Sequence, residues 1–270
     1  MADQLNSFSI TGVAASLAAA MGIEAPTQAN PAIDQIVNLV KNGIDGGRVD
    51  RVFMYNPDAV AMWLYQKYTA LFDNVVKHTS LSVPLQTVMP SVTPVCFGSL
   101  YTGAFPAVHG IQKYEKPVIR IDTLFDALIR AGKKPVIIGD PHCSLSHIFL
   151  ERDMDYFTGD TIEAINKKAM ELIEEDKYDF YVVYNGNYDS LMHKFGPESD
   201  EAMAQLRDNV ASFDRLITAL KQKWTNHDTL FAFAMDHGCH EIDGSCGSHG
   251  LDMPEDLNIL HHYGLIPHTR

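Results

Sequence analysis

The sequence predicts an α/β fold, a three-layer sandwich in which a mostly parallel central sheet carries helices on both faces. The first observation is an alternation, from about residue 48 onward, of short apolar segments with longer segments of helical periodicity. This alternation is typical of parallel sheets covered by helices. The second is that Asp, Thr and His side chains follow several of the predicted strands, at the sheet edge where open α/β sheets bind ligands. The third is the absence of any internal repeat or clear linker, which favours a single domain.

The elements follow in order. Residues 1–47 predict a helical N-terminal extension packed on the core. Segment 10–21 consists mainly of small apolar residues, prolines interrupt the chain at 26–31, and the apolar residues of segment 32–41 recur with helical spacing. Residues 48–270 predict one α/β domain. We expect strands at 52–55, 83–89, 135–138, 180–184 and 229–235, and helices at 60–77, from Thr93 onward, at 123–131, 161–175 and 199–224.

Composition narrows the class of protein. The formal charge of −13 argues against nucleic acid or anionic membrane as a partner. No apolar run approaches the roughly 20 residues of a membrane span, and the Ala-rich stretch 12–22 lacks the basic start of a signal peptide. Four cysteines make no disulfide framework, so we expect a cytoplasmic protein. The helical extension offers a surface for a homo-oligomer.

The stretch 234–250 predicts a metal site. Asp236 and His237 directly follow an apolar segment, and His249 lies further along among small residues. Asp189 and His193, four residues apart after the strand predicted at 180–184, either fall on one helical face or converge from one tight turn. Carboxylates and imidazoles together are the ligands of divalent metal ions such as zinc.

Thr93 is the candidate nucleophile. We expect it at the N-cap of a helix with Pro94 at the first helical position, so that its hydroxyl stands where anions are favoured. Asp58 follows the strand predicted at 52–55, within Asn56-Pro57-Asp58, which is also an ordinary turn sequence.

In this arrangement the chain resembles the alkaline phosphatase superfamily, especially its compact branch of phosphodiesterases, nucleotide pyrophosphatases and phosphonoacetate hydrolases. The resemblance spans about residues 49 to 250. It rests on Thr93 with Thr102-Gly103 and His109-Gly110-Ile111, on Asp189–His193 with Gly196-Pro197, on Asp236-His237-Gly238, and on His249. Two departures are visible. Asn56-Pro57 stands between the predicted strand and Asp58, and Cys96 occupies a position where the diesterase branch commonly has an Asn that binds phosphoryl oxygens.

The resemblance implies a two-metal hydrolase of phosphate esters. One metal would be held by Asp58, Asp236, His237 and the Thr93 oxygen, and the other by Asp189, His193 and His249. Thr93 would attack phosphorus to form a phosphothreonine, which water then cleaves. The mixed ligands favour zinc, with manganese or another divalent ion as an alternative. Other readings are a phosphonate hydrolase that cleaves a C–P bond, a phosphomutase, or a metal-binding homologue without activity. Each of the catalytic readings implies a small phosphorylated or phosphonate substrate.

The other histidines and cysteines receive structural interpretations. We expect His109 to bond to backbone groups near the site, and the segments around His142, Cys143 and His147 and around Cys239, His240 and Cys246 to be loops. His261 and His262 are expected at the surface.

Overall fold

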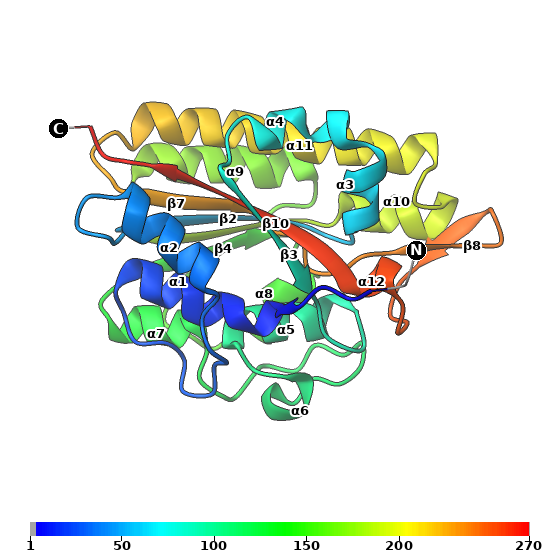
Figure 1. Cartoon of the computed structure of the whole chain (residues 1–270), viewed down its shortest axis with the longest axis horizontal. Coiled ribbons are helices and arrows are strands. Elements are labelled where there is room, and N and C mark those ends of the chain that lie inside the picture. Colours follow the sequence, from blue (N-terminus) through cyan, green and yellow to red (C-terminus); the bar gives the residue numbers. More distant parts are fainter. Residues whose placement is uncertain (1–3, 270) are drawn as a thin grey trace.

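Strand β2 lies near the middle of an eight-stranded sheet in the computed structural model, which describes residues 4–269 (Figure 1). The strand order is β1-β3-β10-β7-β2-β6-β4-β5, and β10 pairs antiparallel to both of its neighbours while the other pairs are parallel. The strands are β1 Phe8–Ser9, β2 Arg51–Pro57, β3 Leu81–Gln86, β4 Pro135–Gly139, β5 Asp155–Thr158, β6 Phe180–Asn185, β7 Thr229–Phe233 and β10 Asn258–Ile266, with a separate hairpin of β8 His240–Ile242 and β9 Cys246–Ser248.

Helices cover both faces of this sheet. The helices α9 and α11 lie on one face, with α3 and α4 beside them, and α1, α2, α5, α7 and α8 lie on the other (Figure 1). Their bounds are α1 Val13–Met21, α2 Asp34–Gly43, α3 Met62–Lys67, α4 Asp73–Val76, α5 Thr93–Thr102, α6 Pro106–His109, α7 Leu124–Arg130, α8 Ser144–Ile148, α9 Ile162–Glu175, α10 Asn187–Phe195, α11 Asp200–Lys223 and α12 Pro254–Leu257, with short 3-10 turns η1 Ile10–Gly12 and η2 Thr69–Phe72. The predicted three-layer α/β fold is confirmed.

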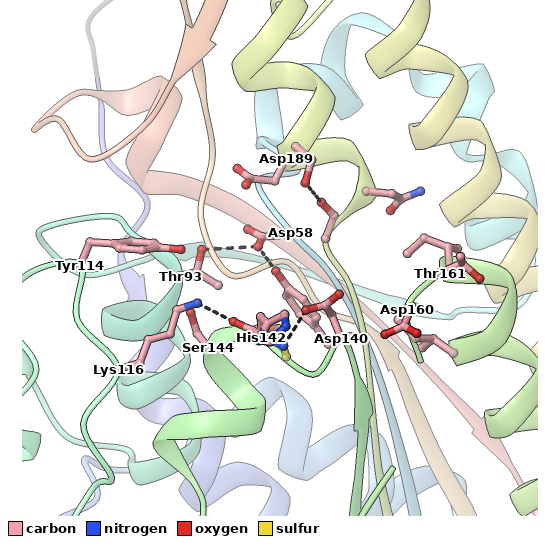
Figure 2. A pocket seen from close by; sticks show the side chains of 17 residues that line it. Asp58, Thr93, Tyr114, Lys116, Asp140, His142, Ser144, Asp160, Thr161 and Asp189 are labelled. Carbon is pink, nitrogen blue, oxygen red and sulfur yellow. Dashed lines mark hydrogen bonds between the residues drawn. The ribbon is translucent and has the colours of Figure 1, made fainter. Parts of the chain in front are cut away.

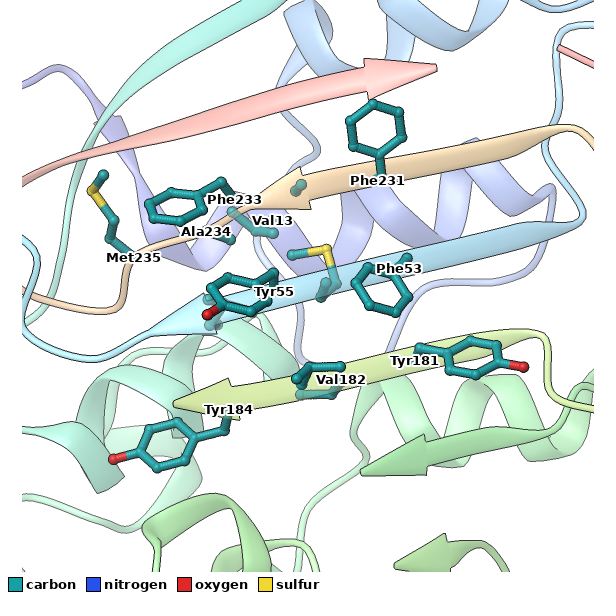
Figure 3. Packing of buried hydrophobic residues seen from close by; sticks show 14 of the residues in the cluster. Val13, Phe53, Tyr55, Tyr181, Val182, Tyr184, Phe231, Phe233, Ala234 and Met235 are labelled. Atoms are coloured by element: carbon teal, nitrogen blue, oxygen red, sulfur yellow. The ribbon is translucent and has the colours of Figure 1, made fainter. Parts of the chain in front are cut away.

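The central strands are buried on both faces, which is why they read as continuous apolar runs. Alternate side chains point to opposite faces. Phe53 and Tyr55 of β2 pack edge-on against Trp224 and Phe213 on the α11 side, and Tyr55 stacks on Phe233 of β7 (Figure 3). Each such ring contributes about 1.5–3 kcal/mol by leaving water, so these strands are held firmly and their ends can position a site.

One predicted helix is interrupted. The segment 60–77 forms α3, the 3-10 turn η2 and α4 rather than one helix. Tyr68 leaves helical geometry at φ −120° and ψ 41°. The Thr69 hydroxyl donates to the carbonyl oxygen of Tyr65 at 2.9 Å, a local bond that competes with helix continuation.

Strand β10 was not predicted, and it overturns the expectation that His261 and His262 lie at the surface. Both side chains are fully buried because β10 pairs with β3 on one side and β7 on the other. The Nε2 of His261 donates to the carbonyl oxygen of Met235 at 2.6 Å, and its Nδ1 accepts from the hydroxyl of Tyr263 at 3.0 Å. A histidine with both nitrogens bonded can be buried without charge.

The N-terminal segment contributes to the same core. Strand β1 extends the sheet beside β3, and Val13 and Leu17 of α1 are completely buried. A domain division at residue 47 stays a prediction. Among residues 4–269 no helix is both long enough and apolar enough to cross a membrane.

Candidate active site

The predicted site residues lie at the carboxyl edge of the sheet. Asp58 follows β2 directly, because Asn56 and Pro57 belong to the strand and pair with Tyr184 and Asn185 of β6. The expectation that these two residues separate Asp58 from the strand is therefore wrong. Pro57 is accommodated because it ends the strand.

Thr93 is the first residue of α5, one position later than expected. Val92 is the N-cap, with extended backbone, and its carbonyl oxygen accepts from the amides of Val95 and Cys96. The Thr93 hydroxyl is thus free of a capping bond. It lies 3.4 Å from Oδ2 of Asp58 and 3.3 Å from Nε2 of His237, and only 4% of the residue is exposed.

The first group of candidate ligands surrounds this hydroxyl and consists of Asp58, Asp236 and His237. The Nε2 of His237 lies 3.2 Å from Oδ1 of Asp58 and 3.3 Å from Oδ2 of Asp236. All three residues are at most 1% exposed. Neither of these two carboxylate oxygens accepts a hydrogen bond, so two buried oxygens face one imidazole nitrogen and lack a donor.

The second group consists of Asp189, His193 and His249. The Nε2 atoms of the two histidines are 3.0 Å apart, and each is 3.3 Å from Oδ1 of Asp189, which accepts no hydrogen bond. The two groups adjoin, because the rings of His237 and His249 lie 4.0 Å apart, centroid to centroid. The structure thus brings together all seven residues singled out from the sequence.

The histidines have a common orientation. Nδ1 faces a backbone carbonyl oxygen in each: Gly238 for His237 at 2.9 Å, Gly247 for His193 at 3.0 Å and Ser91 for His249 at 2.8 Å. A carbonyl oxygen carries no proton, so Nδ1 donates and Nε2 is the atom that faces the carboxylates. The Nε2 atoms of His193 and His249 lie 3.0 Å apart, so a proton or a bound cation between them satisfies both. Backbone bonds of this kind orient the metal-ligating histidines of proteins.

Charge also favours cations here. Burial and the neighbouring Asp58 raise the pKa of Asp236. Burial lowers the pKa of His237, but Asp236 and Asp58 outweigh it and raise the value to about 10. Burial opposes ionisation of Asp189, yet the imidazoles of His193 and His249, each 3.3 Å from its Oδ1, hold its pKa below its usual range. Buried carboxylates of this density need compensating positive charge, which a divalent ion supplies. The residues present therefore fit two metal ions.

Tyr184 is a site residue that we did not single out from the sequence. It is the fifth residue of β6, and its hydroxyl donates to Oδ2 of Asp58, the oxygen that also accepts from Thr93. Burial and Asp58 raise the pKa of Tyr184, so its proton stays in place. Only its position at a strand end hinted at this role. The carbonyl groups that orient the histidines leave no signal in the sequence at all.

A cavity of about 400 Å³ opens beside Thr93 and Asp58. It extends toward residues that follow β4, β5 and β6, including Asp140, Asp160 and Asp189 (Figure 2). Tyr114 and Lys116 line it from the loop after α6, and Figure 2 shows the hydroxyl of Tyr114 directed toward Thr93. The site therefore has room for a small ligand next to the candidate nucleophile.

Cys96 lies away from this cavity. Its side chain is completely buried and its thiol contacts Thr87 and the backbone of Val88. Burial raises the pKa of this thiol, so it is a neutral core residue. The position held by Asn in the diesterase branch hence presents no donor to a ligand in this protein.

The remaining histidines and cysteines have structural partners. His109 bonds to the Ser99 hydroxyl at 3.0 Å and to the amide of Ile111 at 3.3 Å, so a side chain as well as the backbone satisfies it. His142 and Cys143 lie in the loop before α8, whereas His147 is inside that short helix. His240 pairs with Asp256, and Cys239 contacts Tyr188.

Comparison with known proteins adds an independent line. Residues 132–260 match the family model of type I phosphodiesterases and nucleotide pyrophosphatases. The matched segment contains Asp189, His193, Asp236, His237 and His249, while Asp58 and Thr93 precede it. None of the curated proteins compared matches the chain. The family description indicates a hydrolase of the phosphodiesterase or pyrophosphatase type. Through this match, residues 132–260 are similar to the type I phosphodiesterase and nucleotide pyrophosphatase family, which belongs to the alkaline phosphatase superfamily.

Proposed function

We propose that the protein is a metal-dependent hydrolase of phosphate esters that uses Thr93 as its nucleophile. The observation that carries the proposal is the convergence of two buried carboxylate oxygens that accept no hydrogen bond, on Asp58 and Asp236, with Nε2 of His237 beside the Thr93 hydroxyl, next to the adjoining group of Asp189, His193 and His249. A solvated polar surface would not leave these buried atoms facing one another without donors.

The chain's residues take distinct roles. Asp58, Asp236 and His237, with the Thr93 oxygen, would hold one divalent ion, and Asp189, His193 and His249 the other. When bound, the ions lower the pKa of a hydroxyl and neutralise charge on phosphoryl oxygens. Thr93 Oγ1 would lose its proton and form a bond to phosphorus as the bond to the alcohol oxygen breaks; the alcohol oxygen leaves with a proton, and the product is a phosphothreonine. Water would then break the bond between phosphorus and Oγ1, which restores the Thr93 hydroxyl and releases phosphate from a monoester or a monoester from a diester. Tyr184 holds Asp58 in place throughout.

The ligand set favours zinc, since it combines imidazole nitrogens with carboxylate oxygens, and manganese is the alternative. Protein dialysed against zinc should retain about two ions per chain by elemental analysis. Asp189→Asn should retain about one. His142→Ala, a cavity residue outside both groups, is the control and should retain as many as the natural chain. Fewer than one zinc ion per natural chain would contradict the proposed metal sites.

Thr93→Ala tests the nucleophile. The variant should fold as the natural chain does, because the Thr93 side chain caps no helix. With p-nitrophenyl phosphate and its methyl ester as substrates, kcat should fall by at least about 10³-fold, since the Thr93 hydroxyl is the proposed nucleophile and contacts both Asp58 and His237. Activity within a few-fold of the natural chain would show that water attacks phosphorus directly. A phosphonate in the same assay separates the C–P hydrolase alternative.

A further inference from the structure

The cavity wall opposite Asp58 carries polar groups that the proposed mechanism does not use. They are the hydroxyl of Tyr114 and the ammonium of Lys116, both from the loop that follows α6. Lys116 is the only lysine or arginine among the described residues that line the cavity. Four carboxylates also line the cavity: Asp58, Asp140, Asp160 and Asp189. The positive charge of Lys116 therefore stands out in a cavity whose other charged side chains are acidic.

Lys116 is held in a defined position. Its Nζ donates to the carbonyl oxygen of His142 at 2.6 Å and lies 5.6 Å from the ring centroid of Tyr114. An ammonium group has three donors, so two remain for a ligand. No carboxylate forms an ion pair with Lys116 among the described residues, which leaves its charge available.

Tyr114 lies at the end of this wall that is next to Thr93. Its ring is 63% exposed, yet its hydroxyl points toward Thr93 (Figure 2). A phenolic hydroxyl is both a hydrogen-bond donor and an acceptor. It can therefore donate to an oxygen of a phosphoryl group next to Thr93.

Resting on the proposed function, we propose that Tyr114 and Lys116 bind the non-bridging oxygens of the phosphoryl group and select phosphate monoesters over diesters. The buried Cys96 supplies no donor to the cavity, whereas the Tyr114 hydroxyl and the Lys116 ammonium are both donors at its wall. A monoester presents one more non-bridging oxygen and one more negative charge than a diester. An ammonium favours that extra charge, whereas a second ester group would leave its donors unpaired.

The wall also limits what else the substrate carries. Asp140 and Asp160 follow the neighbouring strands β4 and β5 and both line the cavity, where the amide of Gly159 donates to the carbonyl oxygen of Gly139 at 3.0 Å. Two carboxylates there repel further phosphate groups. The alcohol part of the monoester is accordingly uncharged or cationic.

The test compares p-nitrophenyl phosphate with its methyl ester on the zinc-loaded enzyme. Lys116→Gln should lower kcat/KM for the monoester by about 10²-fold and for the diester by less than about tenfold, in line with the loss of one oxyanion donor. Tyr114→Phe should lower the monoester value by at least about tenfold. Lys113→Gln is the matched control, because Lys113 is in the same loop but pairs with Glu115 at 3.3 Å, outside the cavity.

An unchanged ratio of monoester to diester rates in Lys116→Gln, or an equal change in Lys113→Gln, would overturn the inference while the hydrolase proposal stands. Binding of inorganic phosphate, measured by calorimetry on the same zinc-loaded proteins, separates the two proposals. If no ester is cleaved but Lys116→Gln alone weakens phosphate binding about tenfold or more, the wall binds phosphoryl oxygens and the hydrolase proposal fails.

Discussion

Each histidine of the two groups gives one ring nitrogen to the backbone and keeps the other for a ligand. His193, His237 and His249 all donate from Nδ1 to a carbonyl oxygen. This leaves the three Nε2 atoms oriented toward the neighbouring carboxylates. At the scale of single residues the site is therefore organised in advance, and the cost of binding falls mainly on desolvating the ions.

Asp58 is the residue whose role can be tested most sharply. Asp58→Asn is nearly isosteric but removes the negative charge, so it should weaken the ion held with Asp236 and His237 and leave the other ion bound. Activity should fall steeply at low zinc and recover in part at high zinc. In EDTA the variant should melt at a higher temperature than the natural chain, because two buried carboxylates no longer oppose each other. Metal titrations and melting curves measure both effects.

The control for Asp58→Asn is Asp140→Asn, which removes a carboxylate from the same cavity outside both ligand groups. If the two variants show the same zinc dependence as the natural chain, Asp58 is a turn residue and holds no metal.

At the scale of elements, the site depends on how closely α10 and the hairpin strand β9 approach each other. Gly247 of β9 supplies the carbonyl oxygen that orients His193 of α10. A Cβ at Gly247 would lie 2.4 Å from Sδ and 2.9 Å from the carbonyl oxygen of Met192. The sulfur can move, but the backbone oxygen cannot, so only glycine allows this contact.

Gly247→Ala should push β9 away from α10 and misplace His193 and His249 together. Zinc retention should drop from about two ions to about one, with the loss confined to the group that contains Asp189. Ser248→Ala, in the same strand, is the matched control and should retain both ions. Elemental analysis after dialysis measures the zinc bound per chain. Two ions retained in Gly247→Ala would show that β9 can shift without displacing the ligands.

Some of the strands could be predicted from the sequence, and others could not. Central strands such as β2 and β6 are apolar on both faces, so their positions and the ligands at their ends could be predicted. Strand β10 could not, because His261 and His262 read as polar surface residues until pairing partners cover them. Tyr184 reads as a core aromatic, and its bond to Asp58 depends on the register between β6 and β2.

At the scale of the whole molecule, the sheet separates two kinds of buried histidine. Those at the carboxyl edge face carboxylates and keep a lone pair for a cation. His261 and His262 lie within the sheet in β10, where burial lowers the pKa of each to about 4. These two stay neutral at pH values where a histidine in an unfolded chain becomes charged.

His262 should therefore make the fold sensitive to acid. Its folded-state pKa of about 4 lies below the unfolded value of about 6.5, so the unfolded state binds more protons in this interval. The free energy of unfolding is therefore highest above pH 6.5, where the ring is neutral in both states, and it decreases as the pH falls toward 4, because only the unfolded state gains the proton. One such group changes the free energy of unfolding by about 3 kcal/mol over that window.

His262→Phe should remove this part of the acid sensitivity. Phenylalanine keeps the ring contact with Tyr65, whose centroid is 5.0 Å away, and gives up the bond of Nδ1 to the Ser82 hydroxyl at 2.8 Å. Denaturant unfolding of both proteins at pH 7.5 and 4.5 gives four free energies. The decrease in the free energy of unfolding between the two pH values should be smaller in the variant by about 2–3 kcal/mol. The contributions of the metal-ligand groups to this decrease cancel in the comparison, because both proteins contain them. Equal losses in the two proteins would mean that His262 is already accessible to protons in the native state, against the burial that β3 and β7 impose on it.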